Sequence, residues 1–184
     1  KKLRMIVYLR LLSPENDEFV KEIAINDNQS FAELHDYIQE MLDYDPAQMA
    51  SFYTTDHNWN KEVEVTLVDM AYGEIGNVKE MQNTLLSELI NQKGQRLLYI
   101  FDFFSERAFF IEIIQLVDGH LEKAKCIRND GKAPEQIMIG DITGDLQKQN
   151  VSVGKDEFDG SVESLNFSSL DELDMDSEEF NSLY

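Results

Sequence analysis

Two apolar runs of strand length, 97–101 and 109–114, form the most hydrophobic part of the sequence. A short polar segment, 105–107, lies between them, and this arrangement is typical of a β-hairpin. Because both runs are apolar at nearly every position, we expect strands that are covered on both faces. The sequence therefore predicts a central hairpin, with Phe101 and Ile111 buried on facing strands.

Shorter runs predict four more strands, two on each side of a helix. In the run 62–67, valine and leucine alternate with glutamate, so Val63, Val65 and Leu67 should face a core. The four predicted strands are 5–12, 19–25, 51–55 and 62–67.

Two helices are expected between these strands. Ser30 and Glu33 have the spacing of a capping box, and apolar residues follow at helical intervals until the chain reaches Pro46. A second helix is predicted over 84–92, with Asn83 as its cap. Its expected buried face consists of Leu85, Leu86, Leu89 and Ile90.

The resulting order, ββ-α-ββ-α-ββ, indicates an α+β fold with a mixed or antiparallel sheet and helices on one face. The first half has the connectivity of a ubiquitin-like half-fold, an analogy that carries no activity with it. No element is predicted beyond Gly140. We therefore expect a folded domain over 1–140 and an acidic tail over 141–184.

The net charge of −20 is unevenly distributed along the chain. Residues 1–140 contain 14 Lys and Arg against 24 Asp and Glu, whereas residues 141–184 contain 2 against 12. Such a field repels phosphate backbones and anionic membranes and favours basic partners. We expect no binding of nucleic acid by the chain alone, and none of membranes.

The acidic tail also contains spaced bulky apolar residues, a composition typical of a disordered segment that orders on a partner. A tail that only solubilises the protein is the alternative, although it would need no aromatic residues. The partner-binding residues predicted are Phe167, Leu170, Leu173, Phe180 and Tyr184 of the tail, and Trp59 of the folded domain.

Cys126 is the single cysteine, so no intramolecular disulfide can form, which fits a reducing compartment. The basic and apolar start, 1–10, reads as a strand rather than as a signal peptide. No segment approaches the ~20 apolar residues of a membrane helix. A cytoplasmic location is therefore expected.

Few residues have the spacing that catalysis or metal binding requires. Gln39 stands where a helical zinc site would place a second histidine after His35, and the acidic stretch around Gly160 does not fit a calcium loop. Basic neighbours of Cys126 could activate its thiol, but no aligned histidine is evident. No catalytic, metal or cofactor site is predicted, and no cofactor is expected.

Three groups of residues in the sequence form a recognisable combination. The groups are Phe31-x-x-Leu34-His35-x-x-Ile38-Gln39 with 48–52, then 99–103, and Cys126 with Gly131-x-Ala133-Pro134-Glu135. Together they resemble the Ri-plasmid open-reading-frame-three-like family, whose members are also labelled transposon passenger proteins. The resemblance covers about 3–137, leaves out the tail, and is strongest to a Bacteroidetes-type branch with an acidic C-terminus. It implies the fold and a bacterial cytoplasmic setting, without a reaction.

The chain departs from the family pattern in the predicted hairpin. Phe104-Ser105 replaces a Gly-Asp pair, and Arg107 and Phe109 stand at Trp and His positions. A polar site formed by those residues in other members would be absent here.

Two functions from different classes are compatible with these observations. The first is a non-enzymatic interaction module whose acidic tail binds a basic surface of a larger machine, such as RNA polymerase or the ribosome. The second is an accessory protein of a mobile element with hydrolase or nucleic-acid-processing activity, using Asp56, His57 and Asp102. The second requires these three residues to line one pocket.

Overall fold

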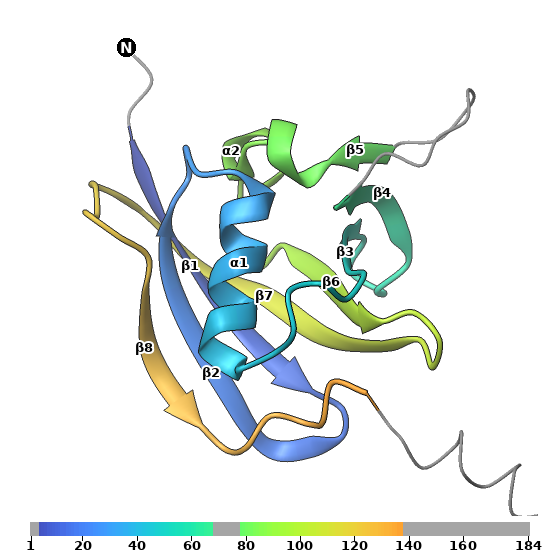
Figure 1. The fold of residues 1–184 in the computed structure, drawn as a ribbon. Helices are drawn as coiled ribbons and strands as arrows, with labels where there is room; N and C mark the ends of the chain where they lie inside the picture. The colour runs from blue at the N-terminus through green and yellow to red at the C-terminus, as the bar shows by residue number, and fades with distance from the viewer. Residues whose placement is uncertain (1–3, 68–77, 138–184) are drawn as a thin grey trace, which may run out of the picture. The chain divides into compact units, whose positions relative to one another are not determined.

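The computed structural model describes residues 4–67 and 78–137 (Figure 1). The tail and the residues predicted in it lie outside the described residues. The described strands are β1 (Met5–Ser13), β2 (Asn16–Asn26), β3 (Ser51–Thr55), β4 (Lys61–Thr66), β5 (Val78–Glu80), β6 (Arg96–Asp102), β7 (Arg107–Asp118) and β8 (Lys125–Asp130). The helices are α1 (Phe31–Leu42), the 3₁₀ turn η1 (Met81–Asn83) and α2 (Leu86–Leu89).

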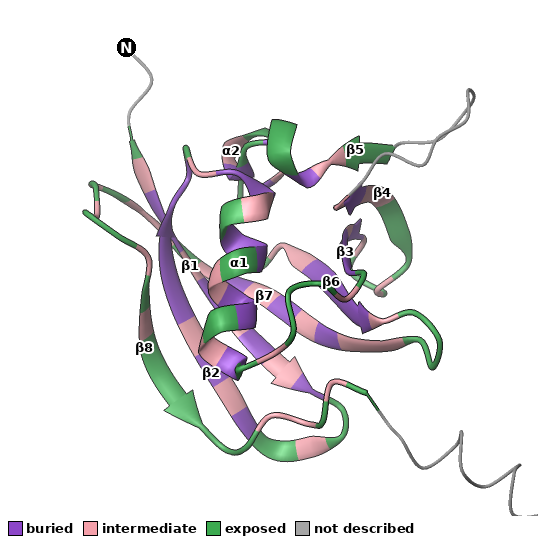
Figure 2. Cartoon of the chain, viewed as in Figure 1, coloured by how far each residue is buried: buried purple, intermediate pink, exposed green. Residues whose placement is uncertain are grey.

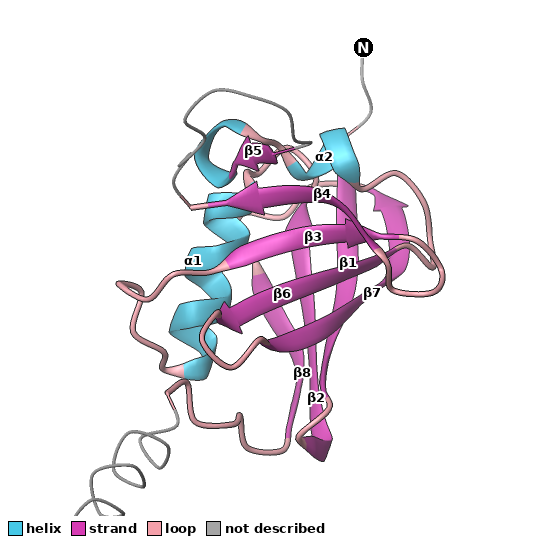
Figure 3. Cartoon of the chain, turned by 90° about the vertical axis from the view of Figure 1, so that its right-hand side faces the viewer, coloured by secondary structure: helices cyan, strands magenta, loops and turns pink. Residues whose placement is uncertain are grey.

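The described strands form one mixed sheet in the order β5-β4-β3-β6-β7-β1-β2-β8. Only β4 and β5 pair in parallel, whereas every other neighbouring pair is antiparallel. The sheet curves around α1 (Figures 1 and 3). An α+β fold with a mixed sheet is thus confirmed, while the ubiquitin-like half-fold stays a prediction.

The predicted hairpin forms the middle of this sheet as β6 and β7. Leu97 pairs with Ile111 across it, and Leu98 pairs with Phe110. Phe101 and Ile111 are 2% and 1% exposed, so their predicted burial is confirmed. α1, β6 and β7 each contribute buried residues to one hydrophobic core, and the buried parts of these elements are purple in Figure 2.

The capping box at the start of α1 is also confirmed. The Ser30 hydroxyl accepts the Glu33 amide at 3.2 Å, and the Glu33 carboxylate accepts the Ser30 amide at 2.7 Å. Asp43 ends the helix in the left-handed conformation, three residues before Pro46. Phe31, Leu34 and Ile38 face the core from α1, as their helical spacing predicts.

The second predicted helix is wrong in length and in its cap. It spans only Leu86–Leu89, and Asn83 belongs to the preceding 3₁₀ turn. The Glu88 carboxylate, rather than the Asn83 side chain, accepts the Leu85 amide at 3.0 Å. Leu85 is 40% exposed, so it does not belong to the buried face.

Two edge strands, β5 and β8, are absent from the predicted order. β5 has three residues and pairs only with β4. β8 pairs only with β2, and most of its side chains are exposed and polar. An exposed edge strand does not require alternating apolar residues, so the sequence of β8 does not predict a strand.

Candidate functional site

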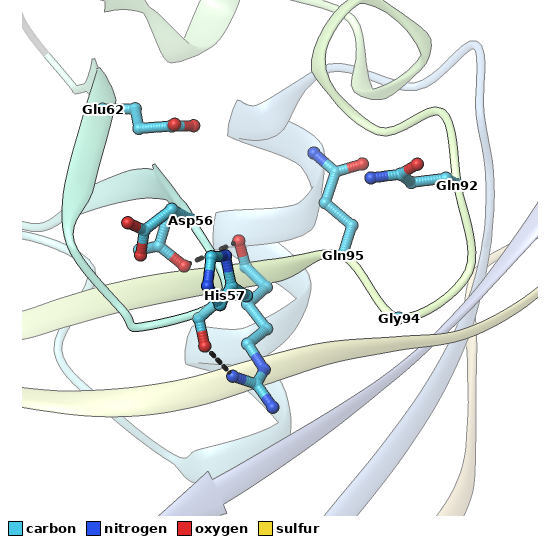
Figure 4. Close-up of a pocket in the computed structure, with 8 residues that line it drawn as sticks. Asp56, His57, Glu62, Gln92, Gly94 and Gln95 are labelled. Carbon is cyan, nitrogen blue, oxygen red and sulfur yellow. Dashed lines mark hydrogen bonds between the residues drawn. The ribbon is translucent and has the colours of Figure 1, made fainter.

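A polar pocket of about 320 Å³ opens beside the turn between β3 and β4 (Figure 4). This volume is at the lower end of the range for small-molecule sites. Its residues come from the β3–β4 turn, from β4 and from the loop that leads into β6. They are Thr55, Asp56, His57, Glu62, Gln92, Gly94, Gln95 and Arg96.

The Asp56 carboxylate holds the turn together. It accepts the backbone amides of Asn58 and Asn60 at 2.7 and 2.9 Å, and the Asn60 side-chain amide at 2.8 Å. These hydrogen bonds, the Asn60 side chain foremost, lower the pKa of Asp56. A carboxylate stabilised as the anion in this way is a weak base for proton transfer.

Other polar groups of the pocket are also engaged in the fold. The Thr55 hydroxyl donates to the Arg96 carbonyl at 3.1 Å, so it is not positioned as a nucleophile. The Arg96 guanidinium donates to the His57 carbonyl, and the His57 ring lies 3.2 Å from the Asn58 amide nitrogen on the exposed surface. The pocket can thus bind a small polar ligand, but it presents no activated nucleophile.

Trp59, the predicted contact residue of the folded domain, packs against the sheet. Its backbone is left-handed, with φ of 67°. Its ring meets the Phe110 ring edge-on with centroids 4.7 Å apart, and the Arg96 guanidinium lies 4.9 Å from it. Trp59 is half-buried, so it contributes to stability and leaves only part of its surface for a partner.

Asp102 lies far from this pocket. Arg96 begins β6 and Asp102 ends it, which separates them by roughly 20 Å at ~3.3 Å per residue. Its carboxylate accepts the Phe104 and Ser105 amides at 3.0 and 3.2 Å. The structure therefore does not bring Asp56, His57 and Asp102 together, so the single pocket that the second function requires is not formed.

A polar network inside the core was not anticipated from the sequence. The Tyr99 hydroxyl lies 2.7 Å from Nδ1 of His35 and accepts the Gln39 amide at 2.5 Å. All three side chains are at most 2% exposed. Burial lowers the pKa of His35 and raises that of Tyr99, so both side chains are neutral at pH 7.

Charges alternate across the outer face of four neighbouring strands. Arg96 on β6 pairs with Glu112 on β7 at 3.8 Å, and Arg10 on β1 pairs with Glu22 on β2 at 2.7 Å. The register places Glu112 opposite Arg10. This row of charged side chains depends on pairing between strands that are distant in sequence, so it could not be predicted from the sequence alone.

The family model of the plasmid pRiA4b ORF-3-like proteins matches residues 5–178. The chain belongs to this family. The match extends well beyond residue 137, so the expectation that the resemblance leaves out the acidic tail is wrong for most of the tail. The family description gives no reaction.

The fold of this plasmid pRiA4b ORF-3-like chain is similar to that of a solved structure. It is a protein of unknown function, MM3350, from Methanosarcina mazei Go1, with a TM-score of 0.56 and 17% identity. The similarity covers 70% of this chain and 71% of that protein. Among proteins with curated descriptions, no significant match exists.

Cys126 of this plasmid pRiA4b ORF-3-like chain lies on β8 and is not activated. Its thiol lies 3.0 Å from the Arg128 carbonyl, to which it donates. Burial raises its pKa, and this effect outweighs the opposing charge of Lys21. A raised pKa leaves less thiolate at pH 7, which argues against a reactive cysteine.

The part of the chain that the structure describes contains no cluster of three or more potential metal ligands. Within the same residues no helix is long and apolar enough to span a membrane. The predicted tail anchors, Phe167, Leu170, Leu173, Phe180 and Tyr184, lie outside the described residues.

Proposed function

We propose that this protein is a non-enzymatic interaction module whose acidic C-terminal residues bind a basic surface of a larger machine. The observation that carries the proposal is that the side chains considered for catalysis have structural partners instead. Asp56 holds a turn, Asp102 holds the hairpin tip, and the His57 ring lies 3.2 Å from the Asn58 side-chain amide on the exposed surface. Residues of this kind are poor candidates for proton transfer or nucleophilic attack.

The charge distribution favours a basic partner over nucleic acid or lipid. Residues 141–184 carry 2 Lys and Arg against 12 Asp and Glu, interspersed with bulky apolar residues. Acidic groups accelerate the encounter with a basic surface, and apolar groups supply anchors once contact is made. RNA polymerase and the ribosome, which handle nucleic acid and expose basic surfaces, are the partners that we favour.

Binding of the full chain to purified RNA polymerase and purified ribosomes tests the proposal. Alanine at the four principal tail anchors should weaken binding at least tenfold, because anchor residues carry most of an interface's energy. Four other apolar residues of the tail, replaced in the same way, form the matched control. The anchors are Phe167, Leu170, Leu173 and Phe180, and the controls are Ile142, Leu146, Val151 and Val153.

Added salt should weaken the interaction mainly by slowing association, since exposed charges are screened beyond ~8 Å at physiological ionic strength. Equal loss of binding in the anchor and control variants would contradict the assignment of the anchors. An absence of binding to both machines would remove them as partners.

A further inference from the structure

Four exposed apolar side chains gather at one end of the sheet, at the tip of the β6–β7 hairpin. Phe104 is 92% exposed, and Met49, Phe103 and Ile137 are 42–49% exposed. Ser51 pairs with Ile100 in antiparallel register, and a continuation of this register places Met49 opposite Asp102, the residue before Phe103. We name these four residues the tip patch.

Ile137 joins the tip patch through the segment that precedes it. Arg107, the first residue of β7, donates to the Gln136 carbonyl at 3.4 Å. The Gln136 side chain in turn bonds to the Asp45 backbone, at 2.7 Å to its amide and 3.1 Å to its carbonyl. The loop after α1, the start of β7 and the end of the described chain are therefore linked by hydrogen bonds.

Hydrogen bonds and ion pairs hold the backbone of the hairpin tip in place, while the Phe103 and Phe104 side chains are exposed. The Asp102 carboxylate accepts two amides of the turn, as described above. Arg107 makes a bidentate pair with Glu15 at 2.9 and 2.8 Å and lies 5.0 Å from the centre of the Phe101 ring. Its side chain is only 10% exposed. A rigid apolar projection loses little conformational entropy when it enters a pocket, so it is suited to binding.

Exposed acids surround the tip patch. Asp45 and Glu106 are exposed, and Glu106 has a left-handed backbone with φ of 52° in the turn itself. Arg107 at the start of β7 is paired with Glu15 and Asp102, and Lys132, in the segment that leads to Ile137, is paired with Glu135. A complementary partner surface would be an apolar socket bordered by Lys and Arg.

The chain continues from the tip patch directly into the acidic residues. Ile137 is the last described residue before 138–184, so a surface that binds those residues is tethered close to the patch. Two linked contacts strengthen each other through a raised effective concentration. We propose that the tip patch docks into an apolar socket, bordered by Lys and Arg, on the same protein that the acidic residues bind.

This inference rests on the proposed function, and photo-crosslinking of the full chain in living host cells separates the two. The photoreactive amino acid p-benzoylphenylalanine is incorporated in place of Phe104 or, in separate strains, of Leu170 or Ile127. Ile127 is 49% exposed on β8 and serves as the control position outside the tip patch. Crosslinked proteins and peptides are identified by mass spectrometry.

The expected result is one shared partner for positions 104 and 170, and no adduct with that partner from position 127. The peptide crosslinked from position 104 should contain apolar residues flanked by Lys or Arg. A partner captured from position 170 but not from 104, or a second copy of this chain captured from 104, would overturn the inference alone. No adduct from position 170 would overturn the proposed function as well.

A second measurement uses substitution instead of a probe. Phe104→Ser should lower the yield of the position-170 adduct about tenfold, as expected for loss of an anchor residue. Ile127→Ser, at a 49% exposed site on β8 outside the tip patch, should leave the yield unchanged. Both side chains are solvent-exposed, so the two variants should melt at the wild-type temperature. An unchanged yield in Phe104→Ser would refute the docking role of the patch.

Discussion

Substitution by alanine at Phe101 and at Phe104 tests how strongly the burial of a phenylalanine contributes to the stability of the fold. Phe101 is 2% exposed, and its ring centroid lies 4.6 Å from that of Phe109 and 5.6 Å from that of Tyr44. The Arg107 guanidinium lies 5.0 Å from the same ring. Phe101→Ala removes these contacts and leaves a cavity in the middle of the sheet. Such a change costs about 3–5 kcal/mol, a large part of the 5–15 kcal/mol typical of a domain.

Urea denaturation followed by Trp59 fluorescence measures this loss, because Trp59 is the only tryptophan and packs against Phe110. With an m-value of about 2 kcal/mol/M, a loss of about 4 kcal/mol lowers the urea midpoint by about 2 M. Phe104→Ala is the matched control, since a 92% exposed side chain should change stability by less than about 0.5 kcal/mol.

Equal midpoints for the two variants would refute the placement of the core around β6 and β7. A lowered m-value in Phe101→Ala would indicate a change in the compactness of one state, and the free energy would then have to come from hydrogen exchange. Phe101→Leu, which keeps much of the volume, should recover most of the lost stability.

Three further results are expected. Tyr99→Phe removes the hydroxyl shared by His35 and Gln39, and it should lower the free energy of unfolding by about 1–3 kcal/mol in the same urea assay. Stability should also decline as the pH falls below 6.5, because the pKa of His35 is lowered in the folded state and the unfolded chain takes up the proton first. Through His35, the free energy of unfolding should change by at most about 1.4 kcal/mol per pH unit, and His35→Gln should abolish this contribution. Fluorescence anisotropy at physiological salt should detect no binding to duplex DNA or RNA, whereas micromolar binding that salt weakens steeply would disprove this.

The elements with strong local signals could be predicted from the sequence. The capping box at Ser30 and Glu33 defines the start of α1 through hydrogen bonds between residues three apart. The continuous apolar runs of β6 and β7 likewise predict strands that must lie inside a sheet. In each case one segment contains all the information, and tertiary contacts reinforce the local preference.

The elements that depend on distant partners could not be predicted in the same way. The apolar spacing after Asn83 suggests a long helix, yet the chain turns extended at Ile90 after a single helical turn. β8 exists because its backbone pairs with β2, although its side chains are mostly exposed. The same holds for the candidate site. The separation of Asp56 from Asp102 follows from the pairing of Thr55 with Arg96, at the opposite end of β6 from Asp102, and this pairing joins segments that are distant in sequence.

The contacts made by the basic side chains of the sheet are relevant to both proposals. Arg10, Arg96 and Arg107 each pair with a carboxylate on a neighbouring strand or turn, and the ammonium of Lys21 donates to the carbonyls of Asp130 and Gly131. Cations used in this way cannot also neutralise a phosphate backbone without breaking those contacts. The acidic groups outnumber them, and those of residues 141–184 have only two basic residues nearby in sequence. The contacts of these four cations therefore favour the basic protein surface that we propose over a phosphate backbone, and the tip patch is the apolar contact that we propose beside it.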